Sequence, residues 1–193
     1  MRVVIRGAGD LASGVALRLW RAGMDVVLLD VEKPTAIRRT VAFSEAIVHG
    51  KQTVEDVTAR LATAETAEET LAAGMIPMLV DPEGRSIPTL RPDVLVDAIL
   101  AKRNLGTKIC DAPVVIGVGP GFTAGVDCHA VVETMRGHTL GRVIHEGSAI
   151  PNTGIPGLIG GFAGERVLRA PAAGLFHPLR DIGDAVTEGE ILA

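Results

Sequence analysis

The sequence is poor in aromatic residues, which make up 3% of its 193 residues, and it contains no tyrosine. Its apolar residues, 47% of the chain, are therefore dominated by aliphatic side chains, which suit parallel strands buried on both faces. Because single-stranded nucleic acids are bound by stacking on aromatic rings, this scarcity argues against such a function. The formal net charge of −4 and the lack of a basic stripe also argue against binding to a nucleic-acid backbone.

The sequence has few cysteines and no long apolar run. Cys110 and Cys128 form neither a C-x-x-C pair nor a zinc-ligand spacing, and two free thiols are typical of a reducing compartment. No apolar stretch reaches the length that crosses a membrane, and residues 2–6 have the pattern of a strand rather than of a signal peptide. We therefore expect a cytoplasmic protein that binds no membrane.

The first thirty or so residues follow the order strand, glycine-rich turn, helix, strand. Apolar runs at 2–6 and 25–30 predict the two strands. Between them, Leu11, Val15 and Leu19 have the spacing of one helix face. This order is that of a βαβ unit, from which Rossmann-like parallel sheets are built.

The chain continues this α/β pattern to about residue 119 and then changes. Before that point, apolar and capping patterns predict helices at 34–49, 66–73 and 92–101 and strands at 53–61, 76–80 and 113–117. Beyond it glycine and proline are frequent, and residues 127–134 and 140–147 are expected to pair as a hairpin. The sequence thus predicts an α/β fold with a Rossmann-like nucleotide-binding domain over 1–119 and a mostly-β domain over 120–193.

A glycine motif lies between the first predicted strand and helix, where Gly7, Gly9 and Ala12 form the pattern G-x-G-x-x-A. Such a turn lets a pyrophosphate approach the backbone and the free amides of the helix N-terminus. Asp30 ends the next strand, where dinucleotide-binding folds place a ribose-binding carboxylate. The alternative is a turn that only packs the βαβ unit. Asp10 puts a carboxylate where the phosphate would lie, or else caps the helix.

Further residues are expected to close the site around the ligand. Arg38, beyond the second strand, can clamp a phosphate, although an arginine on a helix face is also commonly solvated. Gly119 and Gly121 form a second glycine loop at the carboxyl end of a strand, where open α/β sheets bind ligands. The alternative there is a turn that joins the two domains. Asn104 and Arg136 complete the predicted set of ligand contacts.

An acid–base cluster follows in the second half of the chain. In a strand, Asp127, His129 and Glu133 share one face because their separations are even. Such side chains bind metals or transfer protons, and the alternative is an exposed hairpin face. We expect no metal site and take His129, Glu133 and His138 as the candidates for catalysis, with enzymatic turnover left open.

Nucleophile motifs are missing from the sequence, which has neither a nucleophile elbow nor a phosphate-binding G-x-x-x-x-G-K-[ST] loop. The run Phe43-Ser44-Glu45 places a serine beside a carboxylate. Its pattern favours a helix surface over an activated nucleophile.

Five blocks of sequence, in order along nearly the whole chain, resemble the YqeB family of accessory proteins associated with selenium-dependent molybdenum hydroxylases: VIRGAGDLASG at 4–14, PTAIRRTVAFSEA at 34–46, DAILAKRNLGT at 97–107, GVGPGFTAGVD at 117–127 and ETMRGH at 133–138. The resemblance implies a role in maturing the hydroxylase, with that client enzyme or its maturation machinery as partner. The first half also resembles XdhC-type maturation factors, which implies binding of the nucleotide part of a molybdopterin-type cofactor.

The C-terminal segment resembles half of a barrel-sandwich module of the biotinyl-lipoyl type, over residues 170–174 and 182–193. Half a module leaves strand edges unpaired, so we expect a further segment or another chain to cover them. The Met-Lys-Met carrier sequence of such modules is absent from the 193 residues, which argues against a swinging biotin or lipoyl arm.

Three functional hypotheses follow. The leading one is an accessory protein whose Rossmann-like half binds a nucleotide-containing ligand, the molybdenum cofactor among the candidates. An NAD(P)-dependent oxidoreductase would use the same glycine turn with an acid or base from the later cluster. An interaction protein would keep the fold with an empty site. A homo-oligomer is left open in each case.

Overall fold

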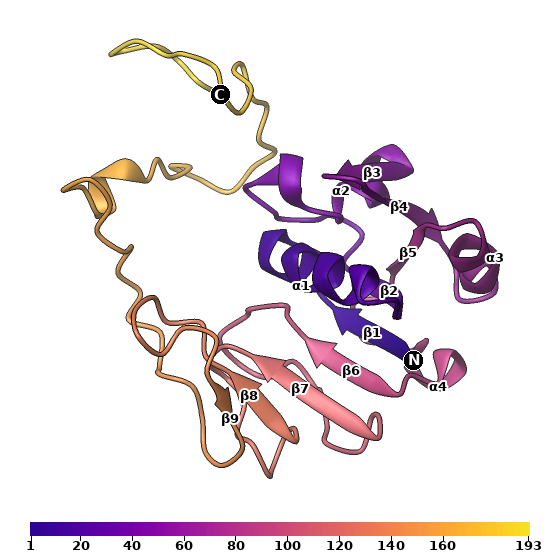
Figure 1. Ribbon diagram of the computed structural model, residues 1–193. Helices are drawn as coiled ribbons and strands as arrows, with labels where there is room; N and C mark the ends of the chain where they lie inside the picture. The colour runs from indigo at the N-terminus through magenta and orange to yellow at the C-terminus, as the bar shows by residue number, and fades with distance from the viewer. The chain divides into compact units, whose positions relative to one another are not determined.

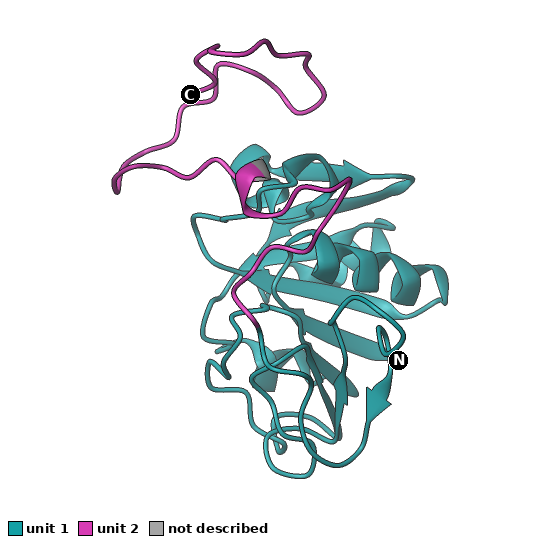
Figure 2. Ribbon diagram, turned by 90° about the vertical axis from the view of Figure 1, so that its left-hand side faces the viewer, with its two compact units in different colours: residues 1–152 teal, residues 153–193 magenta. Residues whose placement is uncertain are grey.

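A computed structural model describes residues 1–193, apart from the side chain of Arg166. The chain forms two compact units, residues 1–152 and residues 153–193 (Figure 2). The boundary predicted near residue 120 lies inside the first unit.

The first unit is built on one sheet, which Figure 1 shows. Its strands are β1 (Arg2–Arg6), β2 (Asp25–Asp30), β3 (Lys51–Val54), β4 (Val57–Ala62), β5 (Ile76–Val80), β6 (Val94–Asp97), β7 (Val114–Val118), β8 (Ala130–Val132) and β9 (Val143–Ile144). Their spatial order is β3-β4-β5-β2-β1-β6-β7-β8-β9. Neighbours from β4 to β8 are parallel, whereas the outer pairs β3–β4 and β8–β9 are antiparallel. The predicted α/β class with a mainly parallel sheet is confirmed.

Strand order reverses at β1, which lies between β2 and β6. From β1 the chain builds one side of the sheet through β2 and β5, and it then returns to β6 and builds the other side. Loops on the two sides of such a reversal leave in opposite directions, which opens a crevice at the carboxyl ends of the central strands.

The helices of the first unit are short except for one. They are α1 (Asp10–Arg21), α2 (Glu45–His49), α3 (Ala67–Ala72) and α4 (Ile87–Leu90), with a 3-10 turn at Arg39–Val41. Helix α1 buries Ala12, Ala16 and Leu17 against the sheet. Its small buried residues let it lie close to β1 and β2, so that its N-terminus meets the crevice.

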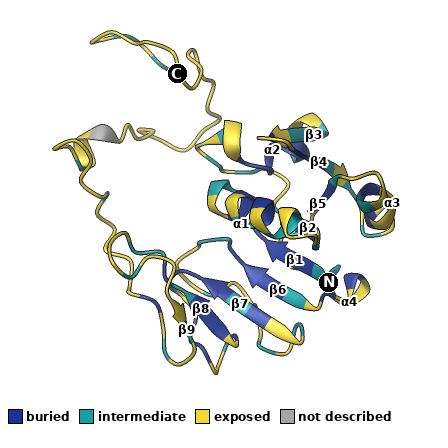
Figure 3. Ribbon diagram, in the orientation of Figure 1, coloured by how far each residue is buried: buried dark blue, intermediate teal, exposed yellow. Residues whose placement is uncertain are grey.

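Both faces of the central strands are buried, as Figure 3 shows by the dark blue of β1 and β6. Val3 and Ile5 of β1 pack on the face that α1 covers, whereas Val4 points into a second core with Leu29 and Leu95. Burial on both faces agrees with the aliphatic composition from which parallel strands were predicted.

Three predicted elements differ from the structure. The helix expected at 92–101 is instead strand β6 followed by a loop, because its apolar residues lie between β1 and β7 in the sheet. The helix expected at 34–49 is an extended segment, a 3-10 turn and the five-residue α2. In addition, the strand expected at 53–61 is a hairpin of β3 and β4, which turns at Glu55 with a positive φ of 55°.

Other predicted elements are confirmed: β1, α1, β2, α3, β5 and β7 lie within a residue or two of their expected places. The hairpin expected after residue 127 is formed by β8 and β9. No helix among the described residues is both long and apolar enough to cross a bilayer.

The second unit has little regular structure. It contains a 3-10 turn at Gly164–Arg166, and its described residues form no strand beyond an isolated bridge between Ile159 and Phe162. The amide of Leu179 donates to the carbonyl of Leu192 over 2.8 Å, and Arg180 pairs with Glu190. The barrel-sandwich half predicted in this region stays a prediction.

Candidate functional site

A cavity of about 440 Å³ lies at the carboxyl ends of β1 and β2. Its walls come from the turn after β1, the first turn of α1, the end of β2, the loop before α2 and the segment after β6. The lining residues are Gly7, Gly9, Asp10, Leu11, Ala12, Asp30, Val31, Thr35, Ala36, Ile37, Arg38, Ser44, Ala98, Ile99 and Leu100. The structure therefore brings together five of the predicted ligand residues: Gly7, Gly9, Ala12, Asp30 and Arg38.

The N-terminus of α1 forms one wall of this cavity. The amides of Asp10, Leu11 and Ala12 have no acceptor within the helix, because they belong to its first turn. Gly9 is the N-cap residue and has no side chain to accept from them. These amides and the positive end of the helix dipole favour an anion at this wall.

The two glycines of the turn have different roles. Gly7 has a φ of +95°, and a Cβ on it would lie 2.8 Å from the carbonyl oxygen of Ala98. Glycine is therefore required there by the protein's own packing. Gly9 has a φ of −66°, and a Cβ on it would meet no atom of the described chain within 4 Å. Since neither conformation nor packing requires glycine at position 9, its open side is available to a ligand.

Asp30 points toward the glycine turn. Its Oδ2 accepts from the amide of Ala8 over 2.8 Å and its Oδ1 accepts from the amide of Val31 over 2.7 Å. Burial raises the pKa of this carboxyl, and the two amide hydrogen bonds only partly offset that effect. Each carboxylate oxygen can accept a second hydrogen bond, so Asp30 is suited to receive a hydroxyl of a ligand.

Asp10 and Arg38 form an ion pair at the cavity. Both Nε and Nη2 of Arg38 contact the same oxygen, Oδ2 of Asp10. The Asp10 side chain is thus directed to Arg38, and α1 has no side-chain cap of its own. The Arg38 side chain is 68% exposed, so water screens the pair and Arg38 can move at small energetic cost.

Ser44 is a site residue that the sequence reasoning missed, because the helix surface predicted for it is wrong. Ser44 is fully buried and lines the cavity. Its amide donates to the carbonyl of Ala8 over 3.0 Å, and the amide of Phe43 donates to Oγ of Ser13 over 2.8 Å. These bonds join the loop before α2 to the glycine turn. The apolar neighbours of Ser44, among them the buried Ala42, were the available signal of burial.

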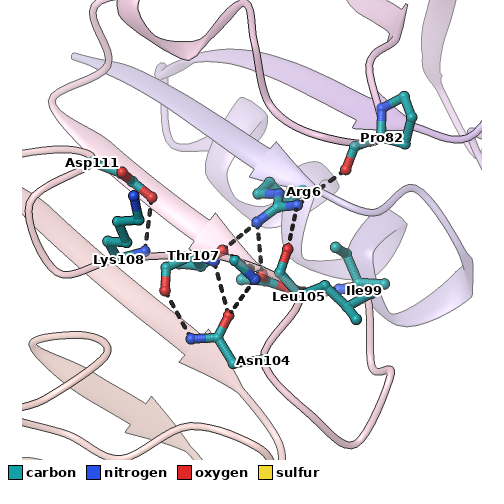
Figure 4. Close-up of polar contacts among 10 residues, drawn as sticks. Arg6, Pro82, Ile99, Asn104, Leu105, Thr107, Lys108 and Asp111 are labelled. Atoms are coloured by element: carbon teal, nitrogen blue, oxygen red, sulfur yellow. Dashed lines mark hydrogen bonds and ion pairs between the residues drawn. The ribbon is translucent and has the colours of Figure 1, made fainter.

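The other predicted ligand residues lie outside the lining of the cavity. Asn104 closes its own loop, since its Nδ2 donates to the carbonyl of Thr107 and its Oδ1 accepts from the amides of Gly106 and Thr107 (Figure 4). Gly121 lies so close to Arg103 that a Cβ would be 2.6 Å from that backbone.

Gly119 and Arg136 are the other two predicted ligand residues that lie outside the cavity lining. A Cβ on Gly119, whose φ is +81°, would lie 2.9 Å from Oγ1 of Thr134. Arg136 is exposed. Both glycines of this loop are therefore required by contacts within the protein.

The acid–base candidates also lie outside the cavity lining. Glu133 is buried, and its oxygens accept from the amides of Met135 and Ile150 over 2.7 and 2.8 Å. Burial alone would raise the pKa of Glu133, but hydrogen bonds from backbone amides outweigh it and the pKa is lowered. His129 accepts from the amide of Val115 through Nδ1, and His138 is exposed. The two hydrogen bonds of Glu133 connect the loop after β8 at Met135 to the segment at Ile150.

A buried polar cluster stabilises the loop after β6 (Figure 4). Nη1 of Arg6 donates to Oγ1 of Thr107 over 2.5 Å, and this hydroxyl donates to Oδ2 of Asp97 over 2.6 Å. Nη2 of Arg6 donates to the carbonyl of Pro82 over 3.0 Å. The amide of Ile99 donates to Oδ1 of Asp97. Because Ile99 lines the cavity, the cluster fixes part of its wall.

A larger hollow, of about 730 Å³, lies at the carboxyl ends of β4 and β5. It is lined by two acidic residues, Glu65 and Asp81. Asp81 already accepts from the amides of Arg85 and Ser86 and from Oγ of Ser86. We place the candidate site at the smaller cavity because its donors are unpaired. The described residues contain no group of three or more His, Cys, Asp or Glu side chains arranged to hold a metal ion.

These features define an α/β protein with a mainly parallel sheet and a cavity at its central strands, one wall of which is the N-terminus of α1. No protein-family model matches the chain. The chain is 58% identical, over 192 residues, to the uncharacterized protein YqeB of Escherichia coli strain K12. The match covers 99% of this chain and 36% of that relative. The identity supports the resemblance to the YqeB family, and the chain spans just over a third of the length of this relative.

Proposed function

We propose that the chain is an accessory protein in the maturation of a selenium-dependent molybdenum hydroxylase, and that its Rossmann-like half binds a nucleotide-containing ligand. The observation that carries the binding proposal is the open side of Gly9 beside the unpaired amides of α1. A ligand that brings a phosphate to this point satisfies donors that the protein leaves free.

The other walls of the cavity suit the rest of a nucleotide. Asp30 is placed to accept a sugar hydroxyl, because its carboxylate faces the turn that holds the phosphate. Leu11, Val31 and Ile37 line the cavity with apolar surface that is 48%, 38% and 87% exposed. A flat heteroaromatic ring is the part of a nucleotide that would cover such surface.

The accessory role rests on the resemblance to the YqeB family, supported by the identity to its Escherichia coli member. The oxidoreductase alternative needs an acid or base beside the bound cofactor. The candidates His129, Glu133 and His138 lie outside the cavity lining, which favours binding over turnover. We place the protein in the cytoplasm, with the hydroxylase or its maturation machinery as partner and a molybdopterin-type cofactor among the candidate ligands.

The variant Gly9→Asp tests the binding proposal. An aspartate N-cap accepts hydrogen bonds from the first amides of its helix. The new carboxylate would therefore bind the α1 amides that we propose as donors to the ligand. Since a Cβ at this position is free of contacts with the described chain, the variant is expected to fold with equal or slightly higher stability.

The measurement is mass spectrometry of small molecules released from natively purified protein. We expect a nucleotide-containing compound from the wild type and none from Gly9→Asp. Gly14→Ala is the matched control, because Gly14 also has open space around it but lies outside the cavity lining. Equal amounts from all three proteins, or no such compound from the wild type, would contradict the proposal.

A further inference from the structure

The hydroxyl of Ser44 is not explained by the protein's own hydrogen bonds. Ser44 is fully buried, and its Oγ has no hydrogen-bond partner among the described residues. A buried hydroxyl without a partner lowers stability, and the great majority of buried polar groups avoid this cost. Because Ser44 lines the same cavity as the amides of α1, a bound group is the natural partner of this oxygen.

The charged side chains around the cavity include one more acidic than basic group. Among its described lining residues the charged side chains are Asp10, Asp30 and Arg38. Arg38 is already paired with Asp10, and Asp30 adds a second carboxylate. The donors left for an anion are therefore neutral, namely the backbone amides at the start of α1 and Oγ of Ser44.

We propose that Ser44 donates a hydrogen bond to a phosphate oxygen held at the amides of α1, and that this subsite selects a phosphodiester over a terminal phosphate. The inference rests on the proposed nucleotide binding. A terminal phosphate carries a charge of about −1.5 to −2 near neutral pH, whereas an internal diester carries one negative charge per phosphate. Neutral donors stabilise the single charge, and the nearby carboxylate of Asp10 repels the second one.

The ligand class is therefore a nucleotide whose phosphates are esterified at both ends, as in a nucleoside diphosphate joined to a second alcohol. Nucleoside diphosphates with a free terminal phosphate are expected to bind more weakly. Asp10 thus acts as a specificity-determining residue by excluding excess charge.

Calorimetric titration with matched pairs of probes, one pair for each of four bases, tests this selection. The pairs are ADP with ADP-glucose, CDP with CDP-glucose, GDP with GDP-mannose, and UDP with UDP-glucose. For the base that binds, we expect the sugar diester to bind more tightly than the diphosphate. Asp10→Asn should reduce this preference, because it removes the repulsion of the terminal phosphate.

The role of Ser44 is tested by Ser44→Ala with Ser13→Ala as control. Ser44→Ala should weaken binding of the preferred sugar diester about tenfold or more, the effect of losing a hydrogen bond to a charged group. Its thermal midpoint without ligand should be unchanged or higher, since the removed oxygen has no partner in the described chain. Ser13→Ala should lower the midpoint, because Oγ of Ser13 bonds to Phe43 and Ala8.

Each other outcome overturns a stated part of the inference. Tighter binding of the diphosphate refutes the charge selection, and equal affinity of Ser44→Ala refutes the role of Ser44. If no probe binds although a nucleotide is released from the purified wild type, the diester assignment fails while nucleotide binding stands. If no probe binds and no nucleotide is released, the proposed function fails as well.

Discussion

The backbone amide of Ala8 donates a hydrogen bond to Oδ2 of Asp30 over 2.8 Å, and this bond joins the turn after β1 to the end of β2. The carboxylate is thereby held against the wall where the amides of α1 are free. Burial raises its pKa above the ordinary 3.8, so ionisation of this carboxyl is less favourable than that of a fully solvated aspartate.

Ligand binding is therefore expected to lower the pKa of Asp30. A sugar hydroxyl that donates to the carboxylate favours its ionised form, whereas the negative charge of the bound phosphate opposes it, and we expect the direct hydrogen bond to have the larger effect. Carbon-13 NMR titration of the side-chain carboxyls, with and without the tightest-binding nucleotide sugar, measures the change. Asp81 serves as an internal control, because it lies at the other hollow. An unchanged or raised pKa of Asp30 would contradict this prediction.

The same raised pKa makes Asp30 a source of pH dependence. The folded protein holds this proton more tightly than the unfolded chain does, so the contribution of Asp30 to stability is present at acid pH. That contribution declines as the pH rises from 3.8 through the raised pKa. In Asp30→Asn, unfolding measured at a series of pH values should lack this decline.

Substitutions of two glycines in the first unit should have opposite effects on stability. Gly7→Ala forces an alanine to a φ of +95° and brings its Cβ within 3 Å of Ala98 and Ile99, which should cost at least about 1–3 kcal/mol. Gly14→Ala, in the exposed middle of α1, should raise the free energy of unfolding by about 1 kcal/mol. Urea denaturation measures both values. A neutral effect of Gly7→Ala would show that the turn after β1 can shift to make room.

Glu133 is expected to stabilise the fold rather than to take part in catalysis. Its pKa lies below the ordinary 4.5, so its stabilising effect is present above pH 4.5 and is lost as the pH falls through the lowered value. Glu133→Gln should lower the free energy of unfolding by about 1–3 kcal/mol at pH 7. The difference in this free energy between the variant and the wild type should become smaller at acid pH. Denaturation at pH 7 and pH 3 tests this, with the exposed Glu146→Gln as a control that should change little.

The buried cluster of Arg6, Asp97 and Thr107 should behave as one energetic unit. Arg6→Met leaves the carboxylate of Asp97 buried without its cation, and such a loss typically costs about 3–5 kcal/mol. The double variant Arg6→Met with Asp97→Leu should cost less than the sum of the two single changes. A denaturation cycle over the four proteins gives the coupling energy, and simple additivity would contradict this description.

Local sequence patterns predicted the part of the cavity that a single βαβ unit creates. Spacing alone placed Asp30 at the end of the strand beside the glycine turn, because a strand, a short helix and a parallel strand bring these points together. The pattern also predicted that Gly7 and Gly9 lie in the turn. It did not distinguish their roles, since the contact that requires glycine at position 7 comes from Ala98, far along the chain.

The features that were missed depend on contacts distant in sequence. Strand β6 has apolar residues whose spacing also fits a helix, and its pairing with β1 and β7 decided the outcome. The burial of Ser44 results from its contact with the turn at Ala8. Arg6 is charged and would be expected at the surface, but Asp97 and Thr107, which bind it, come from the other side of the sheet's reversal point.

The two edge strands of the sheet, β3 and β9, affect whether copies of the protein can pair strand to strand. Strand β9 has two residues, so that margin presents few main-chain groups to which an incoming strand could bind. The other edge strand, β3, is longer, with four residues beginning at Lys51. A charged side chain on an edge strand opposes edge-to-edge pairing with another sheet. Growth into fibres by addition of strands to this sheet is therefore disfavoured at both of its edges.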